Sequence, residues 1–196
     1  MPASIAAAKA GATTGEWAAQ MRAVFGEYRG PTGVSRSVSN KTEGLEHIRD
    51  AVDVVSDKLG RRLKFLMGKP GLDGHFNGAE QIAYRARDCG MEIAYEGIRL
   101  TPEEIVTAAQ NEACHVIGLS VLSGSHMPLL QDLMARLKAE GLDSIPVIVG
   151  GIIPDDDAAR LKTLGVAQVY TPKDFELNTI MMDIVALADP HPVAAQ

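Results

Sequence analysis

Residues 69–78 contain the side chains best suited to chemistry, in a glycine-rich run that holds Asp73 and His75. Asp73 precedes His75 by two residues, so its carboxylate can accept a hydrogen bond from one imidazole nitrogen while the other nitrogen points at a metal. That hydrogen bond fixes the tautomer and the direction of the ring and raises its basicity. Lys69 can in turn hold the carboxylate. The spacing therefore predicts a segment that presents one histidine nitrogen to a metal.

The elements on either side of this segment indicate how it is held. A run of β-type residues at 63–67 predicts a buried strand, and the apolar spacing over 79–89 predicts a helix that Gly90 ends. The segment is therefore a loop that joins a strand to the helix after it.

The alternation of strand and helix patterns continues along the rest of the chain. Further strands are predicted at 91–95, 115–121, 146–150 and 167–170. Thr101 opens the helix after the second strand with a capping box and a first-turn proline, and Gly141 ends the helix after the third. The pattern predicts an α/β fold, a doubly wound (flavodoxin/Rossmann-like) five-stranded parallel sheet flanked by helices.

The chain divides by pattern into an N-terminal helical extension and linker (1–60), a sheet domain (61–188) and a flexible tail (189–196). Thr13 opens a capping box for a first helix, whose apolar stripe begins at Trp17. A second helix carries an apolar seam that can cover one edge of the sheet, made of Leu45, Ile48, Val52 and Val55. The Trp17 stripe has no evident partner in a doubly wound domain, so we expect it to dock on another domain or subunit.

Five candidate residues follow four different predicted strands: His75, Ser120, Gly150, Gly151 and Thr171. In an open parallel sheet, ligands bind in the crevice at the carboxyl ends of the strands, near the point where strand order reverses. These residues are therefore expected to meet at one edge of the sheet.

The spacing Asp-x-His-x-x-Gly, present as Asp73, His75 and Gly78 with Lys69 before it, resembles the lower-ligand motif of cobalamin-binding domains in adenosylcobalamin-dependent acyl-CoA mutases. Later segments are similar to the same family: Ser120-Val-Leu122, Gly150-Gly151 and Tyr170-Thr171-Pro172. The resemblance covers residues 62–187. Within it, the stretches 95–102, 123–126 and 171–177 are most similar to the C-terminal domains of ethylmalonyl-CoA mutases.

The resemblance implies that the chain binds adenosylcobalamin, with His75 as the lower ligand of cobalt in the base-off/His-on form. The displaced nucleotide tail would enter a slot in the domain, past Gly118, Gly150 and Gly151. The implied cofactor-binding residues are Lys69, Asp73, Gly74, His75, Gly78, Ser120, Leu122, Gly150, Gly151 and Thr171. No catalytic residue is implied in this chain.

In the family, the cofactor yields an adenosyl radical that abstracts hydrogen from an acyl-CoA and allows the thioester group to migrate. The chain shows no eight-fold βα pattern for the barrel that binds acyl-CoA in relatives. We therefore expect it to need a barrel domain or subunit, to be inactive alone, and to belong to a homodimer in the full enzyme. An excised domain and a natural small subunit both fit the sequence.

Other functions fit part of the pattern. A small cobalamin-binding subunit of a methylmalonyl- or isobutyryl-CoA-type mutase is a close alternative, because the residues that contact the acyl substrate would lie in the barrel. A stand-alone corrinoid carrier or sensor would share the histidine motif, but such modules usually carry a compact four-helix cap, and the extension is too small for one. A signalling receiver would share the five-stranded sheet, yet the third strand ends in Ser120 where a phosphoacceptor aspartate would stand.

Plainer structural roles remain open at several positions. Gly150 and Gly151 also suit tight strand-to-helix turns, and Ser120 also suits a strand end. His115 is expected to be a hydrogen-bonded boundary residue, and His47 and His191 to face solvent. His126 lies beside the expected crevice, where contact with ligand and a role at a helix start are equally open.

Composition narrows the classes of partner. The chain has 25 acidic and 19 basic residues, for a net charge of −6, so it carries no basic surface for nucleic acid or an anionic membrane. Cys89 and Cys114 are the only cysteines, no secretory leader is recognisable, and no apolar run reaches the length of a membrane span. No set of Cys and His has zinc-ligand spacing. A reduced cytoplasmic setting is expected.

Overall fold

The computed structural model describes residues 2–26, 42–72, 74, 77–174 and 176–190. The chain separates into two compact units, Met1–Asn40 and Lys41–Gln196. Asp73 and His75, on which the predicted metal ligation depends, lie outside the described residues.

The N-terminal unit consists of two helices, α1 (Pro2–Lys9) and α2 (Thr14–Phe25). The predicted capping box is confirmed, because Thr13 Oγ1 accepts a hydrogen bond from the Glu16 N–H while the Glu16 carboxylate accepts one from the Thr13 N–H. Neither helix buries any of its described residues. The apolar stripe that begins at Trp17 is therefore exposed within this unit.

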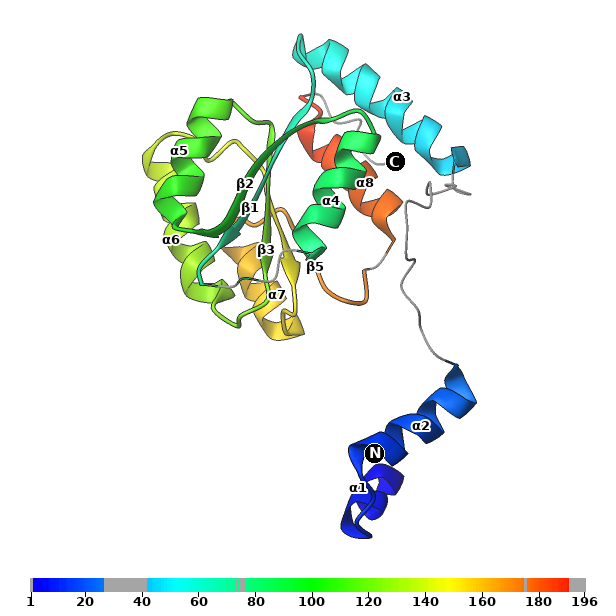
Figure 1. The fold of residues 1–196 in the computed structure, drawn as a ribbon. Coiled ribbons are helices and arrows are strands. Elements are labelled where there is room, and N and C mark those ends of the chain that lie inside the picture. The colour runs from blue at the N-terminus through cyan, green and yellow to red at the C-terminus, as the bar shows by residue number, and fades with distance from the viewer. Residues whose placement is uncertain (1, 27–41, 73, 75–76, 175, 191–196) are drawn as a thin grey trace. The chain divides into compact units, whose positions relative to one another are not determined.

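The second unit is built on one parallel sheet (Figure 1). Its strands are β1 (Lys64–Pro70), β2 (Glu92–Leu100), β3 (Val116–Val121), β4 (Val147–Gly151) and β5 (Gln168–Tyr170). They lie in the order β2-β1-β3-β4-β5, with every pairing parallel. The predicted five-stranded doubly wound fold is confirmed. The order reverses between β1 and β3, which places the topological switch point at their carboxyl ends.

Helices cover both faces of the sheet, as Figure 1 shows. One face carries α3 (Thr42–Leu59), α4 (Asn77–Asp88) and α8 (Leu177–Ala188). The other carries α5 (Pro102–Glu112), α6 (His126–Ala139) and α7 (Asp155–Thr163). Because both faces are covered, every residue of β3 is buried, which explains its continuous apolar run.

Local signals account for several helix ends. Thr101 and Glu104 form the expected capping box at the start of α5, with Pro102 in its first turn. Gly90 and Gly141 follow α4 and α6 with φ of 88° and 69°, in the left-handed region that glycine adopts without a steric penalty.

Helix α3 packs with the sheet domain through its apolar seam. Leu45, Ile48, Val52 and Val55 are buried, and the helix lies chiefly against α8. The sequence division placed this helix before a boundary at residue 60, whereas the compact unit of the sheet begins at Lys41. The apolar seam explains why α3 belongs to the sheet unit. An 18-residue helix with one apolar face can bury that face only by packing against another element.

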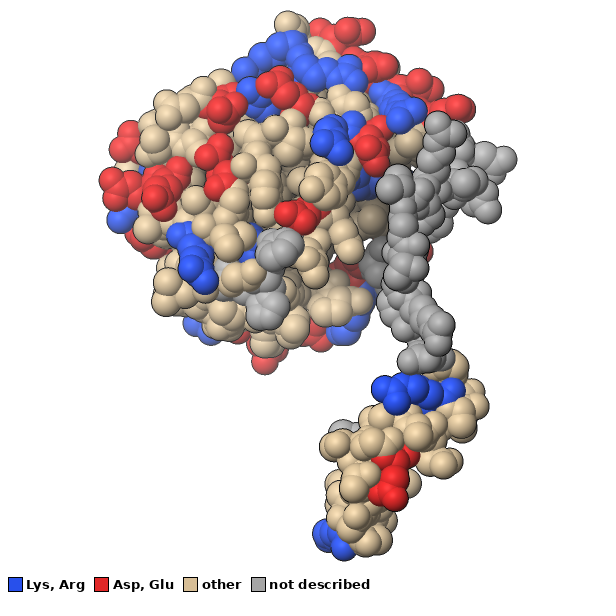
Figure 2. All heavy atoms as spheres, viewed as in Figure 1, with Lys and Arg blue, Asp and Glu red and all other residues tan. Residues whose placement is uncertain are grey.

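The surface of the sheet unit carries charges of both signs. On the face seen in Figure 2, Lys and Arg side chains are interspersed with Asp and Glu, without a broad area of one sign. None of the described helices combines the length and apolar character that a membrane-spanning segment needs.

Candidate functional site

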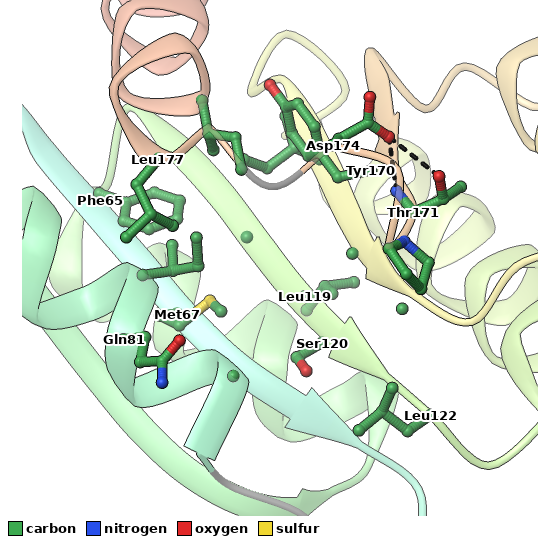
Figure 3. A pocket seen from close by; sticks show the side chains of 18 residues that line it. Phe65, Met67, Gln81, Leu119, Ser120, Leu122, Tyr170, Thr171, Asp174 and Leu177 are labelled. Carbon is green, nitrogen blue, oxygen red and sulfur yellow. Dashed lines mark hydrogen bonds between the residues drawn. The ribbon is translucent and has the colours of Figure 1, made fainter. Parts of the chain in front are cut away.

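A cavity of about 420 Å³ opens at the carboxyl ends of the strands, on the face covered by α4 and α8 (Figure 3). Its volume falls within the range of about 300–1,000 Å³ that is typical of small-molecule sites. The predicted residues that line it are Gly78, Ser120, Leu122, Gly150, Gly151 and Thr171. The structure thus brings together residues from four separate segments at the predicted edge of the sheet.

The wall of the cavity is mostly apolar, with a few polar groups at its rim. Phe65 and Met67 come from β1, Leu177 comes from the start of α8, and Gln81 projects from α4 (Figure 3). Strand alternation places Phe65 and Met67 on the same face as Gly118 and Ser120. Such a wall fits a ligand part that is largely apolar and carries a few hydrogen-bonding atoms.

The glycines of the cavity serve two different purposes. A Cβ on Gly151 would lie 1.9 Å from the Val121 carbonyl oxygen, and a Cβ on Gly118 would collide with the Phe65 ring. These two glycines are required by internal packing. By contrast, a Cβ on Gly150 would meet only Tyr170 Cβ, at 4.0 Å, and a Cβ on Gly78 would meet no atom within 4 Å. The described fold does not need glycine at these two positions, so the missing side chains leave space that a ligand can occupy.

Lys69 is buried at the end of β1, with no exposed surface. Its ammonium donates to the Ser120 carbonyl oxygen and to Ser120 Oγ, both at 3.2 Å. A buried ammonium needs such acceptors, since desolvation without them is costly. Lys69 does not line the cavity. It connects the start of the motif loop, residues 69–78, to Ser120, which does line the cavity. Whether Lys69 also holds Asp73, as predicted, stays a prediction.

The segment after β5 is fixed by short local contacts. The backbone N–H and the hydroxyl of Thr171 both donate to Asp174 Oδ2, at 2.8 and 3.1 Å (Figure 3). The Tyr170 hydroxyl donates to Asp183 Oδ2 at 2.9 Å. Burial, reinforced by this hydrogen bond, raises the pKa of Tyr170 well above its usual value, so the phenol stays neutral. These contacts hold the rim of the cavity in one conformation.

The structure also adds residues that the sequence analysis did not predict for the site. Phe65 and Met67 lie in the strand predicted at 63–67 and Ile82 lies in the helix predicted at 79–89; all three pack in the core and also line the cavity. Asp174 had no role in the prediction. Its signal in the sequence was the spacing Thr171-x-x-Asp174, which favours a side-chain-capped turn. Gly74 is exposed and does not line this cavity, and its predicted contact with the cofactor stays a prediction.

Two of the remaining histidines, His115 and His126, make structural contacts. His115 Nδ1 accepts a hydrogen bond from the Lys64 N–H at 2.8 Å, and burial lowers the pKa of His115, which agrees with its predicted boundary role. His126 is buried and its Nε2 lies 2.9 Å from Asp157 Oδ2, away from the cavity. His47 is exposed, as predicted, and His191 lies outside the described residues.

Comparison with known sequences relates the chain to a protein family. Residues 63–174 match the protein family described as the B12 binding domain. The chain is 69% identical, over its whole length, to 30% of ethylmalonyl-CoA mutase from Cereibacter sphaeroides. It is 54% identical, over 96% of its length, to 27% of ethylmalonyl-CoA mutase from Methylorubrum extorquens. The chain thus spans less than a third of these curated relatives.

A shorter relative and a solved structure extend the comparison. The 2-hydroxyisobutanoyl-CoA mutase small subunit from Aquincola tertiaricarbonis is 40% identical over 63% of this chain and 93% of its own length. A cobalamin-binding protein from Desulfitobacterium hafniense DCB-2 has the same fold, with a TM-score of 0.55 and 19% identity over 85% of this chain and 76% of that one. The family match over residues 63–174, together with the 40% identical small subunit, shows that the chain belongs to the B12-binding domain family.

Proposed function

We propose that this chain binds adenosylcobalamin in the base-off/His-on form, with His75 as the lower ligand of cobalt, and serves as the cofactor-binding part of an acyl-CoA carbon-skeleton mutase. The observation that carries the proposal is the cavity at the switch point, where two glycines leave space that the described fold does not fill. The family match and the mutase relatives support the identity of the ligand.

The cavity residues fit the nucleotide tail that leaves cobalt in this form. The tail ends in an aromatic base, which suits the apolar wall formed by Phe65, Met67 and Leu122. Ser120 Oγ accepts from Lys69, and a hydroxyl that accepts keeps its own hydrogen to donate. Ser120 can therefore donate to a ring nitrogen of the base. Gly78 and Gly150 let the tail approach the backbone where a side chain would stand.

The motif loop would bind the cobalt. His75 would supply the nitrogen ligand, and Asp73 would accept from its other nitrogen and fix the tautomer. Lys69 would hold Asp73 while its ammonium stays anchored on Ser120 at 3.2 Å. The ligand loop and the tail cavity would thus share one buried lysine. When bound, adenosylcobalamin supplies the radical chemistry that starts the rearrangement of an acyl-CoA.

The remainder of the mutase must come from outside this chain. The described residues contain a single five-stranded sheet and not an eight-stranded barrel. The relatives at 69% and 54% identity are more than three times as long, so we place the acyl-CoA-binding barrel in a further domain or subunit. The full enzyme would be a cytoplasmic homodimer. Ethylmalonyl-CoA is the proposed substrate, since the most similar relatives reported above are named for it.

The proposed ligation is tested by titrating the chain with hydroxocobalamin and recording the absorption spectrum. Wild type should show the shift that accompanies replacement of the benzimidazole by imidazole, and His75→Ala should not. His47→Ala is the matched control, because His47 is exposed on α3, and it should behave as wild type. A spectrum unchanged by His75→Ala would exclude His75 as the ligand.

The supporting role of Asp73 has its own measurement. Asp73→Asn should weaken cobalamin binding about 10- to 100-fold, the usual effect of losing a partner of a metal-binding histidine. An affinity equal to wild type would remove Asp73 from the proposal. Turnover of ethylmalonyl-CoA by the isolated chain would contradict the need for a separate barrel.

A further inference from the structure

Arg99 has an unusual backbone conformation. Among the described residues, only Arg99 and Ala113 are non-glycine residues with positive φ, at 64° and 46°. Ala113 caps the end of α5, where a left-handed residue is ordinary. Arg99 lies in β2 instead, where the left-handed conformation costs free energy that a glycine would not pay. A residue held in this way invites a functional explanation.

The strain at Arg99 comes with a β-bulge. In the pairing of β1 with β2, Lys69 lies opposite Ile98 and Pro70 lies opposite Leu100, so Arg99 is the extra residue. A bulge changes the direction of a side chain and is common next to binding sites. The bulge is at the carboxyl end of β2, which is the edge of the sheet where the motif loop begins.

The side chain of Arg99 reaches the motif loop. Its Nη2 atom is 3.9 Å from the point where a Cβ would stand on Gly74, the residue between Asp73 and His75. Within the described part of the chain, the exposed guanidinium makes neither a hydrogen bond nor an ion pair. A strained bulge therefore places an uncompensated cation beside the residue that precedes His75.

The position of Arg99 determines which acceptor it can meet. Gly74 directly precedes His75 in the sequence, so a corrin held by His75, as proposed above, would come within reach of a guanidinium beside Gly74. Guanidinium offers five donors and no acceptor. Cobalamin carries acceptors in two regions, the amide oxygens around the corrin rim and the phosphate, ribose and base of the tail. The tail cavity is lined by β1, β3, β4 and β5, and β2 does not reach it, which favours the rim.

We propose that Arg99 is a cofactor-contacting residue, whose guanidinium donates hydrogen bonds to an amide oxygen at the corrin rim. The proposal rests on the proposed function, because it requires the ring to lie over His75. Arg99 would then fix the rotation of the corrin about the cobalt–histidine bond, and the bulge would be retained for binding in spite of its cost to folding.

Two substitutions separate the strain from the guanidinium. Arg99→Gly removes both, so the cofactor-free chain should unfold at a higher urea concentration than wild type while cobalamin affinity falls about 10-fold. Arg99→Ala removes only the guanidinium, so it should lose the same affinity without the gain in stability. Arg136→Ala removes an exposed arginine from α6 and should leave cobalamin affinity unchanged.

The contacted group is identified with cobalamins in which one rim amide at a time is converted to a carboxylate. For each isomer and for cobalamin itself, the wild-type affinity is divided by the Arg99→Ala affinity. For one isomer this ratio should be about threefold or more higher than for cobalamin, because a carboxylate pairs more strongly with guanidinium than an amide does. An equal ratio for all isomers would assign Arg99 to another acceptor, and unchanged affinity in both Arg99 variants would overturn the proposal. Wild type that fails to bind cobalamin at all would overturn the proposed function as well.

Discussion

Gly150 and Gly151 are adjacent in β4, and we predict opposite consequences when each becomes alanine. At Gly151 the new Cβ would stand 1.9 Å from the Val121 carbonyl oxygen, about 1 Å closer than the 3.0 Å below which such contacts are essentially never seen. Gly151 pairs with Val121 in the sheet, so the backbones of β3 and β4 would have to separate. Overpacking of this kind costs about 1–3 kcal/mol.

At Gly150 the new Cβ would have only Tyr170 Cβ nearby, at 4.0 Å, and would project into the cavity. The backbone there is in a region open to alanine, so the cofactor-free protein should gain about 0.4–1 kcal/mol through the unfolded state. Cobalamin affinity should fall about 10- to 100-fold, because the methyl group occupies space proposed for the tail and overpacking costs about 1–3 kcal/mol.

The assay combines urea unfolding of the cofactor-free chains with absorbance titration by hydroxocobalamin. Gly150→Ala should be at least as stable as wild type and bind poorly, whereas Gly151→Ala should be less stable than wild type before any cofactor is added. The reasoning is refuted if Gly150→Ala binds as wild type does, or if it loses as much stability as Gly151→Ala.

Two further predictions concern stability. Ser120→Ala removes one acceptor of the buried Lys69 ammonium and should cost about 1–3 kcal/mol in urea unfolding of the cofactor-free chain; an unchanged midpoint would show that the hydroxyl does not stabilise Lys69. His115 titrates near pH 6.5 when unfolded, and burial lowers its pKa in the folded chain, so the unfolded state binds more protons and stability should fall as the pH drops below about 6.5. His115→Asn keeps an acceptor for the Lys64 N–H and should flatten this dependence between pH 5 and 7; an identical slope would exclude His115 as its source.

The fold could be predicted where local pattern and burial agree. The apolar run at 115–121 gave β3 because a strand covered on both faces needs no polar alternation. The capping boxes at Thr13 and Thr101 are local signals, and both helices start where those signals indicated. The alanine-rich segment that forms α1 was not predicted as a helix, although alanine has the highest helix propensity.

The ends of β1 and β2 could not be predicted, because tertiary pairing extends them. The first strand was expected to end at Met67, yet β1 continues to Pro70 because residues 68–70 pair with β2, and the Lys69 ammonium finds acceptors on Ser120. The second was expected to end at Tyr95, yet β2 continues through two register shifts to Leu100. Both extensions depend on partners far away in the sequence.

The residues of the candidate site also divide into those that the sequence could predict and those that it could not. Spacing located Ser120, Gly150 and Thr171 at one edge, because the carboxyl ends of parallel strands must meet there. Spacing could not distinguish Gly151, where internal packing requires glycine, from Gly150, where internal packing does not require it. It also could not find Arg99, since a bulge in an edge strand has no apolar period to reveal it.

The central claim, a bond from His75 to cobalt, is tested most directly by electron paramagnetic resonance of cob(II)alamin bound to the chain. With histidine labelled by nitrogen-15, the three-line nitrogen splitting of each cobalt line should become a two-line splitting, and His75→Ala should abolish that change. A three-line pattern that persists in the labelled protein would show that the benzimidazole nitrogen remains on cobalt, and would contradict the account.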